Sequence, residues 1–214
     1  MTHRLSYLRE FRNIGISHSV TLSGISTSVF INMKTNDEKS AYTLSDMEIY
    51  KNITPEFISS REDIINNASI CYIDSEIPES SLSYIFNNIK TPIICQPVTI
   101  SRTLKLKPHL KKIHTLIIGE KYIPLLFSED LQEASNAIMC DKLLETGIKN
   151  IVCLGKKGEI LINSEDRGLE NFKTDFQFEI NDNHGVLAAV AVIYKKMLNP
   201  TAPDGINDII KKLL

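Results

Sequence analysis

Residues 172–198 read FKTDFQFEINDNHGVLAAVAVIYKKML and join a strand pattern, a polar loop and a long apolar stretch. Apolar side chains recur at alternate positions of residues 172–180, with the period of a half-buried strand. Residues 181–185 are turn formers, and residues 186–194 are almost wholly apolar, which predicts a buried helix. The start of such a helix can bind an anion through its free N–H groups and its dipole. A plain strand-loop-helix connection is the alternative interpretation.

The composition indicates a single soluble domain over residues 1–214. Of the 214 residues, 43% are hydrophobic and 23% are charged, which suffices for one sizeable core. The 24 basic and 26 acidic residues give a net charge of −2, so the chain has no net positive charge that would attract nucleic acid or an anionic membrane. No apolar run reaches the ~18 residues that cross a bilayer, and the first residues lack the apolar core of a secretory signal. We expect a cytoplasmic protein without nucleic-acid or membrane partners.

The cysteines and histidines predict no metal site. Cys71, Cys95, Cys140 and Cys153 stand far apart, mostly within apolar runs, whereas zinc sites and disulfide frameworks use paired spacings. The five histidines also lack the spacing of metal ligands. We therefore expect buried, reduced thiols and no metal held by protein ligands.

An antiparallel flap is predicted at about residues 19–45. The stretches SVTL, TSVFINMK and AYTL resemble strands and are separated by turn formers, Ser-Gly and TNDEKS. The pattern changes at Thr54, which can cap a helix, while Pro55 suits the first helical turn. We expect that helix to extend to Asn67.

From residue 69 onward, short apolar strands alternate with helices. We expect strands at 69–74, 92–98 and 114–119, and helices at 79–90, 102–113 and 129–146, the last ended by Gly147. We also expect a hairpin of two strands at 150–163, joined at Gly155-Lys156-Lys157-Gly158. Such alternation indicates βαβ crossovers, and it predicts an α/β fold with a mainly parallel sheet covered by helices on both faces.

This order of elements resembles the PfkB, or ribokinase-like, carbohydrate kinases, and most closely their pseudouridine kinase branch. The strongest similarities lie in TSVFINMK with LSDMEIYKNITPEFI, in ICQPVTISRTLKLKPHLKKIHTL and in IVCLGKKGEILI. The resemblance implies a ribokinase-like fold with a small lid flap. It also implies ATP-dependent phosphorylation of the 5′-hydroxyl of a ribose-like nucleoside, with pseudouridine as the first candidate and with ATP and Mg²⁺ as cofactors. A fold alone does not give a function.

The family's signature loop, GAGD, resembles Asn183-His184-Gly185-Val186, where only the second glycine is kept. The position of the catalytic aspartate is therefore Val186, which cannot accept the proton of the attacking hydroxyl. Asp182 could replace it only if the loop were rebuilt, and a turn or capping role is the simpler interpretation. The backbone amides of the loop still predict an anion-binding site.

Other positions of the family pattern have changed as well. The family's NxxE element helps to place magnesium and phosphate. Its asparagine corresponds to Gly119 in this chain and its glutamate to Tyr122. The aspartate of an Asp-Pro strand end becomes Gln96. The basic residue after that turn resembles Arg102, which could meet a phosphate, although an exposed surface arginine is the commoner explanation.

The hairpin at residues 155–158 resembles the family's nucleotide-side turn. Gly155 and Gly158 keep the LGxxG spacing, and Lys157 would add a positive charge beside a bound nucleotide. Glycine pairs are also common in hairpins for turn geometry alone.

Family members begin with a strand-helix region that carries a Gly-Gly sugar-binding motif, and nothing before His3 resembles it. We therefore expect a truncated domain that lacks half of the substrate pocket, with its sheet edge covered by self-association or by a partner chain. Two function classes stay open. The first is an impaired nucleoside kinase, and the second is a non-catalytic pseudokinase or partner-binding remnant. Loss of a general base, worth about 10²- to 10⁴-fold, favours the second class on mechanism.

Overall fold

The computed structural model describes residue 15 and the ranges 17–34, 41–97, 99–128, 131 and 133–173. The chain divides into two compact units, with the boundary between Asn52 and Ile53. The predicted loop and apolar stretch at 181–194 lie outside the described residues. The expected roles of Asp182, Asn183, His184, Gly185 and Val186 therefore stay predictions.

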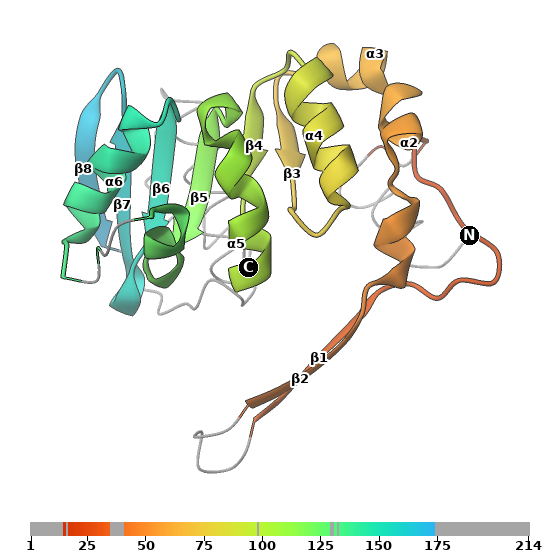
Figure 1. Cartoon of the computed structure of the whole chain (residues 1–214), viewed down its shortest axis with the longest axis horizontal. Coiled ribbons are helices and arrows are strands. Elements are labelled where there is room, and N and C mark those ends of the chain that lie inside the picture. The colour runs from red at the N-terminus through yellow and green to blue at the C-terminus, as the bar shows by residue number, and fades with distance from the viewer. Residues whose placement is uncertain are drawn as a thin grey trace. The chain divides into compact units, whose positions relative to one another are not determined.

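The first unit contains an antiparallel pair of strands, as expected for the flap. Strand β1 (Val29–Lys34) pairs with β2 (Ala41–Asp46), from Val29 opposite Asp46 to Lys34 opposite Ala41 (Figure 1). A 3₁₀ helix, η1 (Glu48–Asn52), follows. The strand expected at 19–22 is wrong, because these residues form no strand and Val20 is 49% exposed. A short alternation without a surface to cover does not make a strand.

The second unit is built on a six-stranded sheet in the order β3-β4-β5-β6-β7-β8. The strands are β3 (Cys71–Ile73), β4 (Ile93–Cys95), β5 (Thr115–Gly119), β6 (Asn150–Leu154), β7 (Glu159–Ser164) and β8 (Gly168–Lys173). The first four strands are parallel, and the last two are antiparallel to their neighbours. The predicted ribokinase-like α/β fold with a mainly parallel sheet is thus confirmed. Strand β8 pairs with β7 from Gly168 to Lys173, and most of the strand expected at 172–180 lies outside the described residues.

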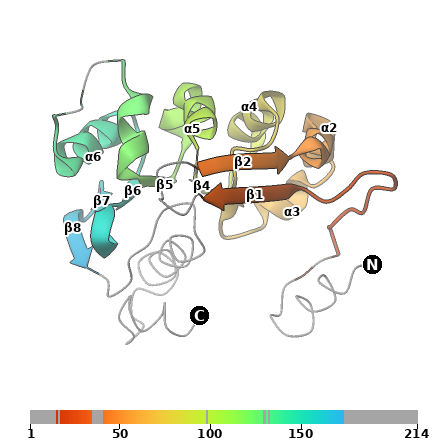
Figure 2. The same cartoon turned by 90° about the horizontal axis from the view of Figure 1, so that it is seen from below.

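Helices precede and connect the parallel strands. Before β3 come α2 (Pro55–Ser59) and α3 (Glu62–Asn66). Between the parallel strands lie α4 (Glu79–Asn88), α5 (Ile100–Leu106), η2 (Lys107–Lys112), η3 (Glu120–Leu126) and α6 (Asn136–Glu145). Figure 2 shows α4, α5 and α6 on the same side of the sheet. Right-handed crossovers between strands that follow one another across a sheet place their helices on one face. These three crossover helices cover one face, so the expectation of helices on both faces stays a prediction.

Three hydroxyl side chains cap helices in the described part of this unit. Thr54 accepts a hydrogen bond from the Phe57 amide at 3.2 Å, as its position before Pro55 predicts. Thr99 and Ser135 do the same at the starts of α5 and α6. These caps satisfy amides that have no partner within the helix.

Three helix predictions need correction. The helix expected at 102–113 begins at Ile100 and gives way to the 3₁₀ helix η2 at Lys107. The helix expected at 54–67 is interrupted at Ser60 and Arg61, which end α2 and begin α3. The helix expected from residue 129 begins at Asn136, because Ser135 provides the cap that starts it. A 3₁₀ turn, η3, occupies the segment directly after β5.

The core lies between the sheet and these helices. Every residue of β4 and β5 is buried. Leu82 of α4, Leu106 of α5 and Leu143 of α6 are completely buried against this sheet layer. Cys95, Cys140 and Cys153 are buried thiols, as expected, and Cys71 is half-buried. No helix in the described ranges is long and apolar enough to cross a bilayer.

Candidate functional site

Polar residues gather where the parallel strands end. The carboxyl ends of parallel strands meet at one edge of a sheet, and ligands of α/β proteins bind there. In this chain the loops that follow β3, β4, β5 and β6 begin at Asp74, Gln96, Glu120 and Gly155. We call this side of the second unit the carboxyl edge.

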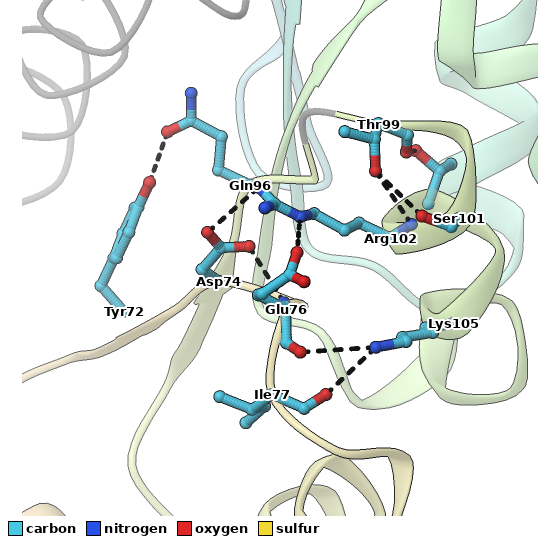
Figure 3. A network of polar contacts seen from close by, with 10 residues as sticks. Tyr72, Asp74, Glu76, Ile77, Gln96, Thr99, Ser101, Arg102 and Lys105 are labelled. Atoms are coloured by element: carbon cyan, nitrogen blue, oxygen red, sulfur yellow. Dashed lines mark hydrogen bonds and ion pairs between the residues drawn. The ribbon is translucent and has the colours of Figure 1, made fainter. Parts of the chain in front are cut away.

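Arg102 is the centre of a polar network at this edge (Figure 3). It lies in the first turn of α5, which begins at the cap Thr99. Its Nε donates to a carboxylate oxygen of Glu76, and its Nη1 lies 3.4 Å from Oδ2 of Asp74. The arginine side chain is only 11% exposed. It is therefore a buried, doubly paired arginine rather than the exposed surface residue that the sequence suggested.

A second basic side chain of α5 binds the same loop. Lys105 Nζ donates to the carbonyl oxygens of Glu76 at 3.4 Å and Ile77 at 3.3 Å. Oδ1 of Asp74 accepts the backbone N–H of Glu76 at 3.1 Å. The loop after β3 is thus fastened to α5 through both side chains and backbone.

Burial shapes the ionisation of this network. Burial raises the pKa of Asp74 above its ordinary value, and the charge of Arg102 only partly opposes this. Burial, followed by the negative charge of Asp74, raises the pKa of Tyr72 to about 12. Tyr72 is therefore a neutral hydrogen-bond donor at neutral pH, and its hydroxyl donates to Oε1 of Gln96.

A smaller cluster surrounds Glu120 at the end of β5. Its Oε2 accepts a hydrogen bond from Nδ2 of Asn136 at 2.8 Å, and its Oε1 lies 3.6 Å from Nζ of Lys156. A Cβ at position 155 would lie 3.4 Å from Oε2 of Glu120 and 3.3 Å from Cβ of Glu159. Gly155 therefore allows the turn after β6 to approach this carboxylate closely.

The predicted nucleotide-side residues lie in the turn between β6 and β7. Gly155 donates its N–H to the Glu159 carbonyl at 2.8 Å, and residues Lys156–Gly158 form one 3₁₀ turn, η4, which includes Lys157. Gly158 has φ +77°, a conformation that favours glycine. Turn geometry alone accounts for Gly158, and the predicted nucleotide contact of the three residues stays a prediction.

The structure brings some of the changed family positions together. Gln96 and Arg102 belong to the carboxyl edge, and Gly119 ends the neighbouring strand β5. Tyr122 is a buried residue of η3. It supplies no exposed polar group at the position of the family's glutamate.

Several polar residues of this edge escaped the sequence prediction. Asp74, Glu76 and Glu120 are acidic residues that directly follow apolar strands, which is the signal that could have singled them out. Asn136 carries no such signal, because it follows a helix cap and not a strand.

Comparison with known proteins places these features in context. No protein-family model matches the chain. It is 26% identical over 102 residues to pseudouridine kinase of Escherichia coli, covering 47% of this chain and 33% of that protein. It is also 26% identical over 165 residues to the uncharacterized sugar kinase YeiI of the same organism, covering 71% of this chain and 46% of that protein. The chain thus spans less than half the length of either curated relative.

Solved structures show the same fold. A putative sugar kinase from Clostridium perfringens superposes with a TM-score of 0.71 at 20% identity, covering 99% of this chain and 67% of that one. Ribokinase from Thermotoga maritima superposes with a TM-score of 0.64 at 14% identity, covering 86% and 59% of the two chains. A putative ribokinase II from E. coli, solved in complex with ATP and Mg²⁺, gives 0.60 at 13% identity, covering 76% and 56%. Sequence and fold together identify the chain as a homologue of the PfkB-type carbohydrate kinases, with a ribokinase-like fold.

Proposed function

We propose that the chain descends from an ATP-dependent kinase of ribose-like nucleosides, with pseudouridine as the first candidate substrate, and that its phosphoryl transfer is impaired. The similarity to pseudouridine kinase and to sugar kinase YeiI supports the substrate class. The polar carboxyl edge of β3–β6 supplies a place for such a ligand.

The single observation that carries the impairment is the residue at position 186. The resemblance aligns Val186 with the catalytic aspartate of the GAGD loop. A valine cannot remove the proton from an attacking hydroxyl, and such a base contributes about 10²- to 10⁴-fold to the rate. Asp182 is the nearest carboxylate in the sequence.

Glu120 is not free to hold a magnesium ion. Within the parts of the chain that the structure describes, no group of three His, Cys, Asp or Glu side chains could hold a metal ion. The two oxygens of Glu120 already face Asn136 and Lys156. Mg²⁺ at phosphate sites is normally held by one or two carboxylates together with the phosphates, so Glu120 would first have to give up one of these partners.

One exposed basic side chain suits the phosphates of a nucleotide. Lys156 is 89% exposed on the turn beside Gly155, so its ammonium group can turn toward an anion. Arg102 could bind a phosphate only by giving up its internal partners Asp74 and Glu76. We expect the chain to bind nucleotide weakly and to transfer no phosphoryl group. Such a chain would be a non-catalytic pseudokinase or partner-binding remnant, which is the second candidate function.

A phosphoryl-transfer assay tests the proposal. Purified protein is incubated with ATP and with pseudouridine or ribose, and we expect no measurable transfer. Val186→Asp should restore a low rate because it returns a carboxylate to the base position, whereas the near-isosteric Val186→Asn should not. Clear turnover by the unmodified chain, abolished by Asp182→Asn, would contradict this and make Asp182 the displaced base.

Self-association, or association with a second chain, is part of the same proposal. In the described sheet β3 is an edge strand, and its Tyr72 is 47% exposed. An edge strand with an exposed aromatic residue can pair with another chain. Sedimentation velocity should show a mass that rises with concentration, and a single-chain mass at all concentrations would contradict the expectation.

A further inference from the structure

The carboxyl edge contains buried polar atoms that have no partner. In the described part of the chain, three buried side-chain polar atoms lack a hydrogen bond, and two of them are Oγ of Ser75 and Nε2 of Gln96. These two residues lie in the loops directly after β3 and β4. The side chains are almost completely inaccessible, because Ser75 is 0% exposed and Gln96 is 3% exposed.

A buried amide nitrogen without a partner is costly. Such a donor loses its hydrogen bonds to water and gains none from the protein, a penalty of about 1–3 kcal/mol. Folded proteins satisfy most such groups, and each exception calls for an explanation, such as an ordered water, an ion or a functional role. The carboxyl edge of a parallel sheet is the place where a ligand is expected.

Tyr72 contacts the carbonyl end of this amide. Its hydroxyl donates to Oε1 of Gln96, so the carbonyl end of the amide faces Tyr72 and the NH₂ end faces away (Figure 3). In this arrangement the amide nitrogen, and not the amide oxygen, is the atom without a partner.

We propose that Nε2 of Gln96 is a specificity-determining contact that donates a hydrogen bond to an acceptor oxygen of the substrate. This rests on the proposed function, in which the ligand is a ribose-like nucleoside with hydroxyl and carbonyl oxygens. The family pattern has an aspartate at this position, which accepts hydrogen bonds and attracts cations. The amide reverses that polarity, because its N–H groups donate to an acceptor oxygen, and an amide nitrogen cannot ligate a metal ion.

Gln96→Met tests the contact with a side chain of similar shape. Ligand-observed NMR titrations of the full chain with pseudouridine and with ribose give the affinities. We expect about five- to tenfold weaker binding for Gln96→Met, in line with the loss of one hydrogen bond. A loss seen with both ligands assigns the acceptor to the sugar, and a loss seen with pseudouridine alone assigns it to the base.

Thermal unfolding gives a second readout. Because the amide is unpaired in the free protein, Gln96→Met should leave the melting temperature unchanged or raise it. Asn163→Leu is the matched control, since Asn163 is a buried amide whose Nδ2 is satisfied by Asp141 at 2.7 Å. That variant should lower the melting temperature and leave ligand affinity unchanged.

Each remaining outcome decides the question. If the unmodified chain binds pseudouridine or ribose and Gln96→Met binds it equally well, this inference is wrong and the proposed substrate class stands. If the unmodified chain binds neither ligand, the substrate class is wrong and the inference falls with it. A melting temperature several degrees lower in Gln96→Met would show that the amide is satisfied within the fold, which also overturns the inference.

Discussion

Arg102 and Glu76 form a buried ion pair that joins the first turn of α5 to the loop after β3. Asp74 adds a second carboxylate at 3.4 Å from the guanidinium. The pair therefore connects two consecutive strand-helix units at the carboxyl edge, and the cation is neutralised from within the fold. This arrangement gives Arg102 a structural role before any ligand is considered.

Arg102→Met should destabilise the second unit by about 3 kcal/mol. Removing one partner of a buried pair leaves the other charge without compensation, which costs about 3–5 kcal/mol when burial is complete. The lower end applies because the side chain of Asp74 is 41% exposed. Urea unfolding followed by circular dichroism measures the change.

Lys149→Met is the control for that measurement. Lys149 pairs with Glu165 on the surface, where both side chains are more than half exposed. Surface pairs contribute about 0–1 kcal/mol, so this variant should stay close to the unmodified chain. Equal losses for the two variants would show that the Arg102 pair has no special structural role.

The stability should also fall as the pH drops below about 6.5, partly because of His114. Burial, followed by the charge of Lys149, lowers the pKa of His114. The unfolded chain takes up its proton at the ordinary value of about 6.5, whereas the folded chain does so only at lower pH. Between these values the unfolded state binds more protons, so the free energy of unfolding rises with pH.

The variant His114→Gln isolates this contribution. Urea unfolding at pH 7.5 and 5.5 should give a smaller difference for His114→Gln than for the unmodified chain. Lys149→Met should reduce the difference part of the way, because it removes the second cause of the shift. An identical pH dependence in all three proteins would contradict the assignment to His114.

Much of the fold could be predicted from the sequence because the strands are short, apolar and separated by strong stop signals. The parallel strands β3 to β6 and the helix stop at Gly147 follow from local patterns. The failed strand at 19–22 shows the limit of such patterns, because two apolar residues become a strand only if a neighbouring surface buries them. Strand β8 likewise depends on pairing with β7, which no local pattern encodes.

The candidate site could be predicted less well. The family pattern drew attention to Arg102 and Gln96, but not to their partners. Whether Arg102 is exposed or buried depends on Glu76, which is 26 residues earlier in the chain. The two side chains come into contact only because β3 and β4 are neighbours in the sheet. The hydrogen bond from Tyr72 to Gln96 is equally non-local. Such polar networks are fixed by tertiary packing rather than by residue spacing.

Gly147→Ala should destabilise the fold by about 2 kcal/mol. Gly147 has φ +103°, and an added Cβ would lie 3.2 Å from the backbone of Lys111. A non-glycine residue at positive φ costs roughly 1–2 kcal/mol, and the close contact adds to this. Gly168→Ala is the matched control, because Gly168 has φ +73° with open space around its Cα. Chemical denaturation should show a smaller loss, of about 1 kcal/mol, for the control, and the reverse order would contradict the packing argument.

ATP binding should be weak and should tighten when Glu120 is neutralised. By its predicted role, the turn at 155–158 lies beside the nucleotide, and Oε1 of Glu120 faces Lys156 Nζ at 3.6 Å. We expect a dissociation constant in the high micromolar range or weaker, about −5 kcal/mol or less favourable. Glu120→Gln removes a negative charge that repels phosphate and frees Lys156, while its side chain can still accept the hydrogen bond from Asn136.

Isothermal titration calorimetry or NMR should therefore show about two- to fivefold tighter ATP binding for Glu120→Gln at low salt, with the gain shrinking as salt increases. Glu165→Gln removes an equal charge at the surface pair with Lys149 and serves as the control, with no change expected. Weaker ATP binding by Glu120→Gln would mean that the carboxylate itself supports the nucleotide, and it would contradict the assignment of Glu120 as a repulsive neighbour of the phosphates.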